Sequence, residues 1–452
     1  MKPTYKIFIL LLVVLFALYQ RTQAQDRQLT LESAVTLALE KNRDLQVAQL
    51  ETQKASERVR EAKGSALPTI GATAQYQYFF QKQVSFLPGS FIGLGENQLA
   101  AVRVGGENAV TGGVNLSQPL FQSGIRAGIR AARTARQVTH AEKDELRAAV
   151  ITQVKKAYLD VLITQERLHL QQQSIVRNEQ ALKDARSLLA QGRASRVDTL
   201  RAFVTVENLR PEVIRLTNGI EIAGTVLKRI IGLDESESIT LRDSLRYDPS
   251  VPVGAGEGAF AEALAARPEV QRLVLTSKLN QQQIAGQAAE RRPKLWAVGS
   301  VLGQSQANNF RLGDYQWPVS SFAGLQLNVP IFSGFRTVAK VRQAQITRQQ
   351  TEKQLENYRE IVRAEVKTGV SGVEEARRRI EVQGQTVATA ELGYRITRDR
   401  WKQGIASRLD LSDAELLLTQ SKSNYLQAVY DYLVAGVELD QALGRTASDL
   451  NR

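Results

Sequence analysis

One octapeptide occurs twice in this chain, and its repetition constrains the fold more than any other feature. Residues 191–198 are Gln-Gly-Arg-Ala-Ser-Arg-Val-Asp and residues 403–410 are Gln-Gly-Ile-Ala-Ser-Arg-Leu-Asp, so six of eight positions are identical, 212 residues apart. Upstream of each copy, Pro-Leu-Phe-Gln-Ser-Gly at 119–124 is matched by Pro-Ile-Phe-Ser-Gly at 330–334. The sequence therefore predicts a tandem duplication in which each half builds the same structural unit.

The first 24 residues have the pattern of a secretory signal peptide. Lys2 and Lys6 precede an apolar run, residues 7–19, that is too short to span a membrane, and the small residue Ala24 ends the segment. We therefore expect residues 1–24 to be removed and the mature chain to be exported. Beyond them no run of about 18 apolar residues occurs, which argues against a transmembrane helix but not against a transmembrane barrel.

Composition excludes several kinds of chemistry. The chain has no cysteine, which removes disulfides, thiolate metal ligands, a cysteine nucleophile and a lipidated N-terminal cysteine. Its two histidines, His140 and His169, lie in polar helical sequence and are expected on the surface. A net charge of +13 would suit nucleic acid, but Lys and Arg are interleaved with Glu and Gln, so solvated helix faces are favoured. We expect no metal, no cofactor and no nucleic-acid partner.

The hydrophobic period changes in the same order in both halves. Each half opens with a predicted helix, residues 31–66 or 259–292, that stops at a proline. A period of two then predicts two strands per half, with the alternation of strands that face lipid on one side and water on the other. A soluble β-hairpin is the alternative. The predicted strands lie within 69–80, 114–117, 295–304 and 323–329, and the turn-rich segments 83–108 and 305–320 are expected to be loops.

The longest helical patterns come next, in residues 124–191 and 334–403. The first contains no proline and would extend roughly 100 Å at 1.5 Å per residue. Six of its apolar residues recur every seven positions, which implies left-handed coiled packing along one narrow seam. They are Val154, Val161, Leu168, Ile175, Leu182 and Leu189. The repeated octapeptide is then a tight turn into a return helix, and residues 234–257 link the halves.

The number of predicted strands per chain implies that several chains assemble into one barrel. Four strands per chain cannot close an outer-membrane barrel, which needs about eight, and an open sheet in lipid leaves backbone groups unpaired. Three chains would supply about twelve strands and six long helical units. We therefore expect an α+β membrane protein, a trimeric 12-stranded β-barrel continued by a long α-helical coiled-coil barrel. The repeats, residues 25–245 and 246–452, would form one continuous domain.

This order of elements resembles the TolC-type outer membrane efflux proteins across the mature chain. The resemblance rests on the duplicated halves, the Gly-x-x-x-x-x-Asp block after each long helix, and Asp410 followed by Asp413. It implies a homotrimeric exit channel in the outer membrane that extends into the periplasm. Such a channel passively conducts substrates received from a periplasmic adaptor (membrane fusion) protein and an inner-membrane pump, proton-driven or ATP-driven.

Two other classes of protein share some of these features. A periplasmic coiled-coil adaptor or scaffold also has long helical hairpins, but it lacks two amphipathic β-hairpins per chain and this duplication. An enzyme is the most distant alternative, because the sequence contains no Ser-His-Asp arrangement, metal cluster or phosphate loop.

The resemblance marks acidic and aromatic candidates for a periplasmic gate or selectivity filter. Asp410 and Asp413 match the family's Asp-x-x-Asp pair, and a ring of carboxylates would favour cations. Asp198 is the first-repeat counterpart of Asp410. Both follow a serine by three residues, so a capping box is an equally open role. Trp401 matches the family's aromatic gate position, with core packing as the alternative.

Position 406 departs from the family pattern. The family's gate arginine falls on Ala406, and Arg408 or Arg400 would have to replace it. The resemblance also implies that the two turns dock the adaptor, although good helix termination is a simpler explanation of the same residues. The candidate docking residues are Gly192, Ala194, Ser195, Arg196, Gly404, Ala406, Ser407 and Arg408.

Overall fold

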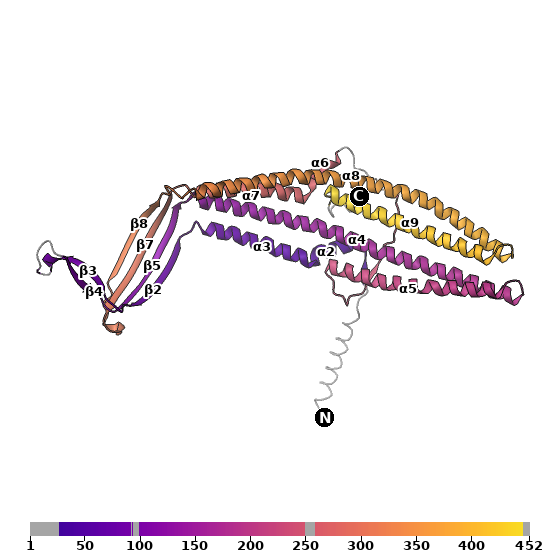
Figure 1. Cartoon of the computed structure of the whole chain (residues 1–452), viewed down its shortest axis with the longest axis horizontal. Helices are drawn as coiled ribbons and strands as arrows, with labels where there is room; N and C mark the ends of the chain where they lie inside the picture. The colour runs from indigo at the N-terminus through magenta and orange to yellow at the C-terminus, as the bar shows by residue number, and fades with distance from the viewer. Residues whose placement is uncertain (1–26, 92, 94–98, 249–257, 446–452) are drawn as a thin grey trace, which may run out of the picture. The chain divides into compact units, whose positions relative to one another are not determined.

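The computed structural model describes residues 27–91, 93, 99–248 and 258–445, so the predicted signal peptide at 1–24 lies outside the described residues. Both halves follow the order of two short helices, two strands of the main sheet, a long helix and a return helix, and the first half adds the hairpin of β3 and β4 (Figure 1). The first half contains β1 (Arg27–Leu29), α2 (Leu31–Lys41), α3 (Arg43–Gly64), β2 (Thr69–Tyr78), β3 (Gln83–Pro88), η1 (Gly89–Phe91), β4 (Leu99–Val104), β5 (Asn108–Phe121), α4 (Ser123–Ala190) and α5 (Arg196–Ile231). The linking segment contains β6 (Ile239–Leu241). The second half contains α6 (Ala259–Ala266), α7 (Pro268–Ala289), β7 (Lys294–Ala307), η2 (Leu312–Asp314), β8 (Val319–Asn328), α8 (Arg336–Lys402) and α9 (Arg408–Leu443).

The chain forms two compact units. The sheet-containing unit consists of Gln53–Thr139 and Val274–Lys353. The helical unit takes the remaining described residues, and it contains both copies of the octapeptide turn. No helix within the described ranges is long and apolar enough to span a membrane.

One four-stranded antiparallel sheet brings the strands of both halves together, in the order β2-β5-β7-β8. The strands occur at all four predicted places, and β5 and β7 are longer than the alternation suggested. The edge strands β2 and β8 are exposed at every one of their ten positions. Each edge strand pairs on one side only, so the sheet presents two rows of backbone groups that lack a strand partner among the described residues.

The expectation of a plain loop at 83–108 is wrong. Strands β3 and β4 pair in antiparallel register there, from Gln83 opposite Val104 to Pro88 opposite Leu99. Between the two strands lie Gly89 and Gly93, and Gly93 has a φ of +78°. The residues of β3 and β4 themselves alternate enough to pair as strands.

The opening helix of each half is interrupted, whereas the sequence predicted one continuous helix. The first breaks at Asn42, whose side-chain Nδ2 donates to the Ile230 carbonyl at 2.7 Å, while its Oδ1 accepts from the Leu45 amide at 3.0 Å. The second breaks at Arg267, which is extended because Pro268 follows it. The two breaks replace the single helices expected over 31–66 and 259–292.

The C-terminal end of a return helix packs against each break. Gly232 caps α5 with a φ of +75°, and a Cβ on it would lie 2.2 Å from the Lys41 carbonyl oxygen. Gly444 caps α9 with a φ of +73°, and a Cβ there would lie 3.0 Å from the Ala266 backbone. Only glycine fits such positions, because a left-handed backbone and a close approach coincide. The two halves therefore close in the same way.

The core of the helical unit follows the predicted heptad seam. Val154 and Val161 are buried with Tyr158 in one cluster, which α5 completes through Leu227 and Ile231. The second repeat builds the matching cluster from α8 and α9. The linking segment adds an unexpected strand, β6, which pairs in parallel with β1. None of the six heptad residues is exposed, and the narrow seam leaves much of each long helix in solvent.

Candidate functional site

The two octapeptide turns share one backbone geometry. Gly192 has a φ of +70° and Gly404 a φ of +79°, both in the left-handed region. The amide after each glycine reaches back to the long helix, from Arg193 to the Leu188 carbonyl at 2.8 Å and from Ile405 to the Arg400 carbonyl at 2.9 Å. This pattern is the Schellman ending that glycine favours. The predicted helix-terminating role of both glycines is thus present.

A capping box starts each return helix. The Ser195 hydroxyl accepts from the Asp198 amide at 3.2 Å, and the Ser195 amide donates to the Asp198 carboxylate at 3.1 Å. The Ser407 hydroxyl accepts from the Asp410 amide at 3.1 Å, and the Ser407 amide donates to that carboxylate at 2.8 Å. Hydrogen bonding of the Asp410 carboxylate by the Ser407 amide, and by its hydroxyl, holds the pKa of Asp410 below its usual range. Both aspartates therefore have a structural role at a helix N-terminus.

The remaining gate candidates lie in different surroundings. Trp401 is only 6 % exposed and packs with Ala181, Ala185 and Leu411. Its indole Nε1 is buried and has no hydrogen-bond partner among the described residues. Asp413 is exposed one turn into α9. Trp401 thus packs inside one chain as its alternative role requires, while Asp413 presents a carboxylate to solvent.

The candidate docking residues are open to solvent with one exception. Gly192, Ser195, Arg196, Gly404 and Ser407 are exposed, and Ala194 and Ala406 are half-buried. Arg408 is only 3 % exposed, and none of its three guanidinium nitrogens has a hydrogen-bond partner among the described residues. Burial lowers the pKa of Arg408, with Tyr394 and two carboxylates acting in the opposite direction.

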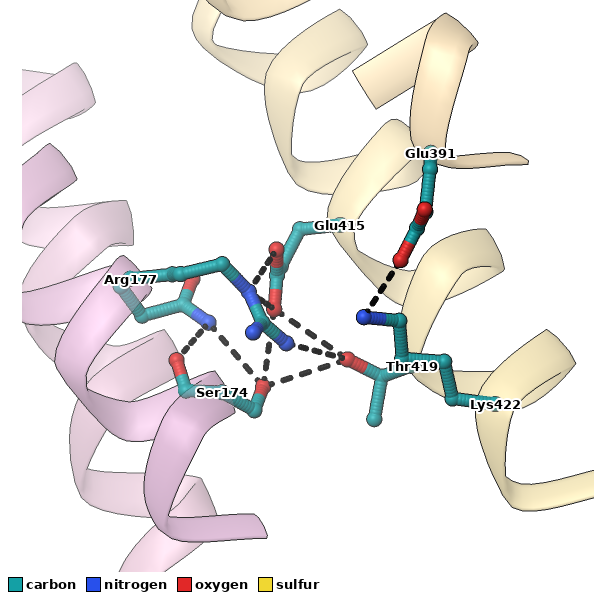
Figure 2. A network of polar contacts seen from close by, with 7 residues as sticks. Ser174, Arg177, Glu391, Glu415, Thr419 and Lys422 are labelled. Carbon is teal, nitrogen blue, oxygen red and sulfur yellow. Dashed lines mark hydrogen bonds and ion pairs between the residues drawn. The ribbon is translucent and has the colours of Figure 1, made fainter. Parts of the chain in front are cut away.

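A buried polar network joins the repeats close to the turns, and the sequence analysis missed it (Figure 2). Arg177 of α4 donates through Nε to both Glu415 carboxylate oxygens of α9, at 2.9 and 3.0 Å. The Ser174 hydroxyl donates to the same carboxylate at 3.0 Å, and the Thr419 hydroxyl does so at 3.2 Å. The Glu415 side chain is only 7 % exposed. A buried carboxylate requires such partners, because desolvation costs it several kcal/mol otherwise.

One sequence signal pointed to this network. Glu415 interrupts an apolar stripe of α9, between Leu411 and Leu418, at the i, i+4, i+7 spacing of one helix face. A charged residue on a buried face needs a partner, but the sequence does not say which. The partner, Arg177, lies 238 residues away in the other repeat.

Further polar contacts run along the same seam between α4 and α9. Lys156 pairs with Glu438 at 2.7 Å, and the Tyr430 hydroxyl donates to Asp160 at 2.5 Å. Within the second repeat, Lys422 of α9 pairs with Glu391 of α8 at 2.7 Å, which lowers the pKa of Glu391. The long helix of the first repeat is thus held to the return helix of the second by charged groups.

These features define a mostly helical chain with a small sheet, and no catalytic centre is assembled among the described residues. The sequence model of the family described as outer membrane efflux protein matches residues 34–233 and 259–445, one match in each half. The chain belongs to the outer membrane efflux protein family, which confirms the resemblance seen in the sequence.

Individual relatives agree with the family. The outer membrane efflux protein BepC of Brucella suis is 24 % identical over 75 % of this chain and 73 % of its own length. The alkaline protease secretion protein AprF of Pseudomonas aeruginosa is 24 % identical over 72 % of this chain and 68 % of its own. The open-state structure of the MtrE outer membrane channel of Neisseria gonorrhoeae superimposes with a TM-score of 0.72 at 20 % identity, covering 92 % of this chain and 89 % of that one. The fold is that of this channel.

Proposed function

We propose that this chain is one subunit of the outer membrane exit channel of a tripartite efflux or secretion system. The observation that carries the proposal is the sheet β2-β5-β7-β8, whose two edge strands are fully exposed. Three copies placed edge to edge would pair those strands and close a barrel of about twelve strands. Closure satisfies backbone groups that lipid would otherwise leave unpaired, each at a cost of several kcal/mol.

The same threefold arrangement would gather six helical units into one tunnel. In this proposal the repeats, residues 25–245 and 246–452, form two adjacent segments of the tunnel wall. Residues 1–24 are the signal peptide that directs export. The long helices suit the wall of a water-filled tube, because only a narrow seam of each is apolar and much of the remaining surface is exposed to solvent. The channel reaches from the outer membrane into the periplasm.

The two turns would form the periplasmic end, where an adaptor protein docks and an inner-membrane pump delivers cargo. The names of relatives include both efflux and protease secretion, so the pump, and not this chain, would select the substrate. In a trimer Asp410 and Asp413 would contribute six carboxylates to the entrance. Asp413 is exposed, which an electrostatic filter for cations requires.

Single-channel recording in planar bilayers tests this function. We expect the purified trimer to conduct and to prefer cations, as a shift of reversal potential in a salt gradient would show. Replacing both aspartates (Asp410→Asn, Asp413→Asn) should reduce that preference. A wild-type protein without conductance would refute the channel, and a mature chain that stays soluble without detergent would favour the periplasmic scaffold.

A further inference from the structure

The junction between helix and sheet differs between the two repeats. Pro68 and Pro293 occupy equivalent places, just before the first sheet strand of each half. Gly124 and Gly334 occupy equivalent places where each long helix begins. Around these positions the first repeat has Ala66, Leu67, Thr69 and Ile125, and the second has Arg291, Arg292, Lys294 and Phe335 in their places. The second repeat therefore carries three more basic residues and one more aromatic residue where its helices meet the sheet.

A basic groove lies at this junction, inside the sheet-containing unit, where β7 begins and β8 ends beside α7 and α8 (Figure 1). This junction groove has a volume of about 570 Å³. Its charged lining consists of one acid, Glu290, and four bases, Arg291, Lys294, Arg336 and Lys340. Glu290 pairs with Lys340 at 3.3 Å, whereas the other three bases form no ion pair with another described residue. Arg291 and Arg336 are exposed, so their charges are open to an anion from outside.

The same groove exposes a pair of aromatic rings, one of them on a strained backbone. Phe335 has a φ of +60° and is the one residue other than glycine with a positive φ in the described ranges. A bulky L-residue rarely adopts this conformation, and such strain is typical of functional positions. The rings of Phe332 and Phe335 meet edge to face with centroids 5.4 Å apart, yet these residues are 74 % and 72 % exposed. Because burial does not account for the strain, we expect the two rings to contact a molecule outside the chain.

An apolar stripe of the sheet leads into the junction groove. Leu325 and Leu327 lie on one face of β8, and Leu295 of β7 stands opposite Leu327 on the same face. The two-residue spacing continues beyond the strand through Val329 to Ile331, which lines the groove and is 95 % exposed. In the proposed barrel this apolar face is the one that lipid covers. The stripe therefore joins a surface suited to an acyl chain to a groove suited to an anionic headgroup.

We propose that the junction groove binds an anionic phospholipid of the periplasmic leaflet. The inference rests on the proposed function for the position of the sheet in the outer membrane, and it adds a lipid site in the second repeat alone. Arg291 and Arg336 hold the headgroup phosphate by charge-assisted hydrogen bonds. The Nε of Arg336 donates to the Ser333 carbonyl at 3.2 Å, which orients the guanidinium and leaves its Nη groups for the phosphate.

The apolar residues of the groove distinguish a phospholipid from a free anion. The rings of Phe332 and Phe335 lie against the first part of the acyl chain, at the membrane interface that aromatic side chains favour. Ile331 extends this contact toward the sheet. A soluble anion such as inorganic phosphate would use the arginines and leave these three side chains bare. A phospholipid engages both the charges and the apolar residues.

Lipid binding to the full-length trimer tests the proposal. Native mass spectrometry counts the lipids retained as dioleoylphosphatidylglycerol, or the zwitterionic dioleoylphosphatidylcholine, is titrated into the detergent-solubilised protein. We expect one tight site per chain and roughly tenfold tighter binding of the phosphatidylglycerol, because basic residues attract its net negative charge. Arg291→Gln and Arg336→Gln should each reduce this preference several-fold. The matched variant Arg126→Gln, at the exposed first-repeat counterpart of Arg336, should keep it.

A further variant separates lipid contact from folding. Phe335→Gly removes the ring and also the strain, because glycine adopts a φ of +60° readily. The thermal unfolding temperature of the trimer should therefore stay level or rise. The affinity for both lipids should fall, and the preference for phosphatidylglycerol should remain. A lower unfolding temperature with unchanged lipid binding would make Phe335 a structural residue and contradict its place in the site.

Several outcomes would overturn the inference. Equal binding of the two lipids to the wild type refutes an anionic lipid as the occupant. An equal loss of preference in Arg126→Gln would assign the effect to general positive charge, and displacement of the lipid by millimolar inorganic phosphate would assign the groove to a free anion. Conductance of the same preparations separates the two proposals, because a conducting trimer without lipid preference defeats only the lipid site. A trimer that keeps the preference and does not conduct defeats the channel instead.

Discussion

The two turns of this chain have the same backbone and different neighbours. Both have a left-handed glycine and a Ser-Asp capping box, so the duplication preserved what ends one helix and begins the next. The differences lie in the side chains around the turns, both buried and exposed. Three positions of the turns differ between the repeats. Leu189, Arg201 and Phe203 of the first repeat correspond in sequence to Trp401, Asp413 and Glu415 of the second. The second copy thus carries the specialised side chains.

The Arg177–Glu415 ion pair between the repeats has no equivalent at the corresponding positions of the duplicated sequence. Shifting the pair by the repeat distance of 212 residues gives Thr389 for Arg177 and Phe203 for Glu415, which cannot form an ion pair. In a ring of alternating repeats, the seam within a chain would therefore be ion-paired, and the seam between chains would not repeat this contact. Within one chain the pair holds α4 of the first repeat to α9 of the second.

The largest expected effect comes from breaking that pair. Glu415→Ala should lower the local stability of α4 and α9 near the turns by about 3–5 kcal/mol, because it leaves the Arg177 guanidinium partly buried without its carboxylate. Hydrogen exchange of the amides in both helices measures the change. The counterpart Phe203→Ala should alter it by less than about 1 kcal/mol, because Phe203 is half exposed.

Two controls sharpen this result. Glu391→Gln breaks the ion pair with Lys422, which is more exposed than the Arg177–Glu415 pair and should cost less than about 1 kcal/mol. The double variant Arg177→Met/Glu415→Leu should recover much of the loss, since removing both charges leaves none unpaired. Equal losses at Glu391 and Glu415 would show that burial does not distinguish the two pairs.

The next largest effect is an increase in stability. Arg408→Met should stabilise the isolated protein at the second turn by about 1–3 kcal/mol, because it removes a buried charge without a partner. Arg196→Met should stay within about 0.5 kcal/mol, as expected for an exposed residue. Exchange protection of the first turns of α5 and α9 gives both values. A destabilised Arg408→Met would mean that the guanidinium already has a partner.

These contrasts show which parts of the molecule could be predicted. The turns were predictable because a glycine, a serine and an aspartate within eight residues determine them locally. The break before Pro268 had a local signal of the same kind, but the break at Asn42 depends on a hydrogen bond to Ile230 in a distant helix. The burial of Arg408 had no signal at all, since its twin Arg196 stands in nearly the same local sequence. The two arginines differ in their burial, which their local sequence does not predict.

A smaller and symmetrical effect is expected at the glycines. Gly192→Ala and Gly404→Ala should each cost about 1–2 kcal/mol, because an L-residue is strained in the left-handed region. A Cβ on Gly404 would lie 3.4 Å from the flexible Arg193 guanidinium, an ordinary contact, so the two variants should cost about the same. Thermal unfolding of the helical signal and exchange at the turns would measure both. A large difference between the variants would contradict the equivalence of the two backbones.

The smallest effect concerns the caps and carries a pH dependence. Ser195→Ala and Ser407→Ala should each cost about 1 kcal/mol through loss of one capping hydrogen bond. The second cap also responds to acid: the pKa of Asp410 is lowered in the folded chain, so its contribution is complete above the ordinary value of 3.8 and is lost as the pH falls through the lower, folded pKa. Exchange protection of the Asp410 amide, followed from pH 6 downward, should therefore fall only in strong acid. In Ser407→Ala this acid step should shrink, and an unchanged step would show that the hydroxyl does not hold the carboxylate.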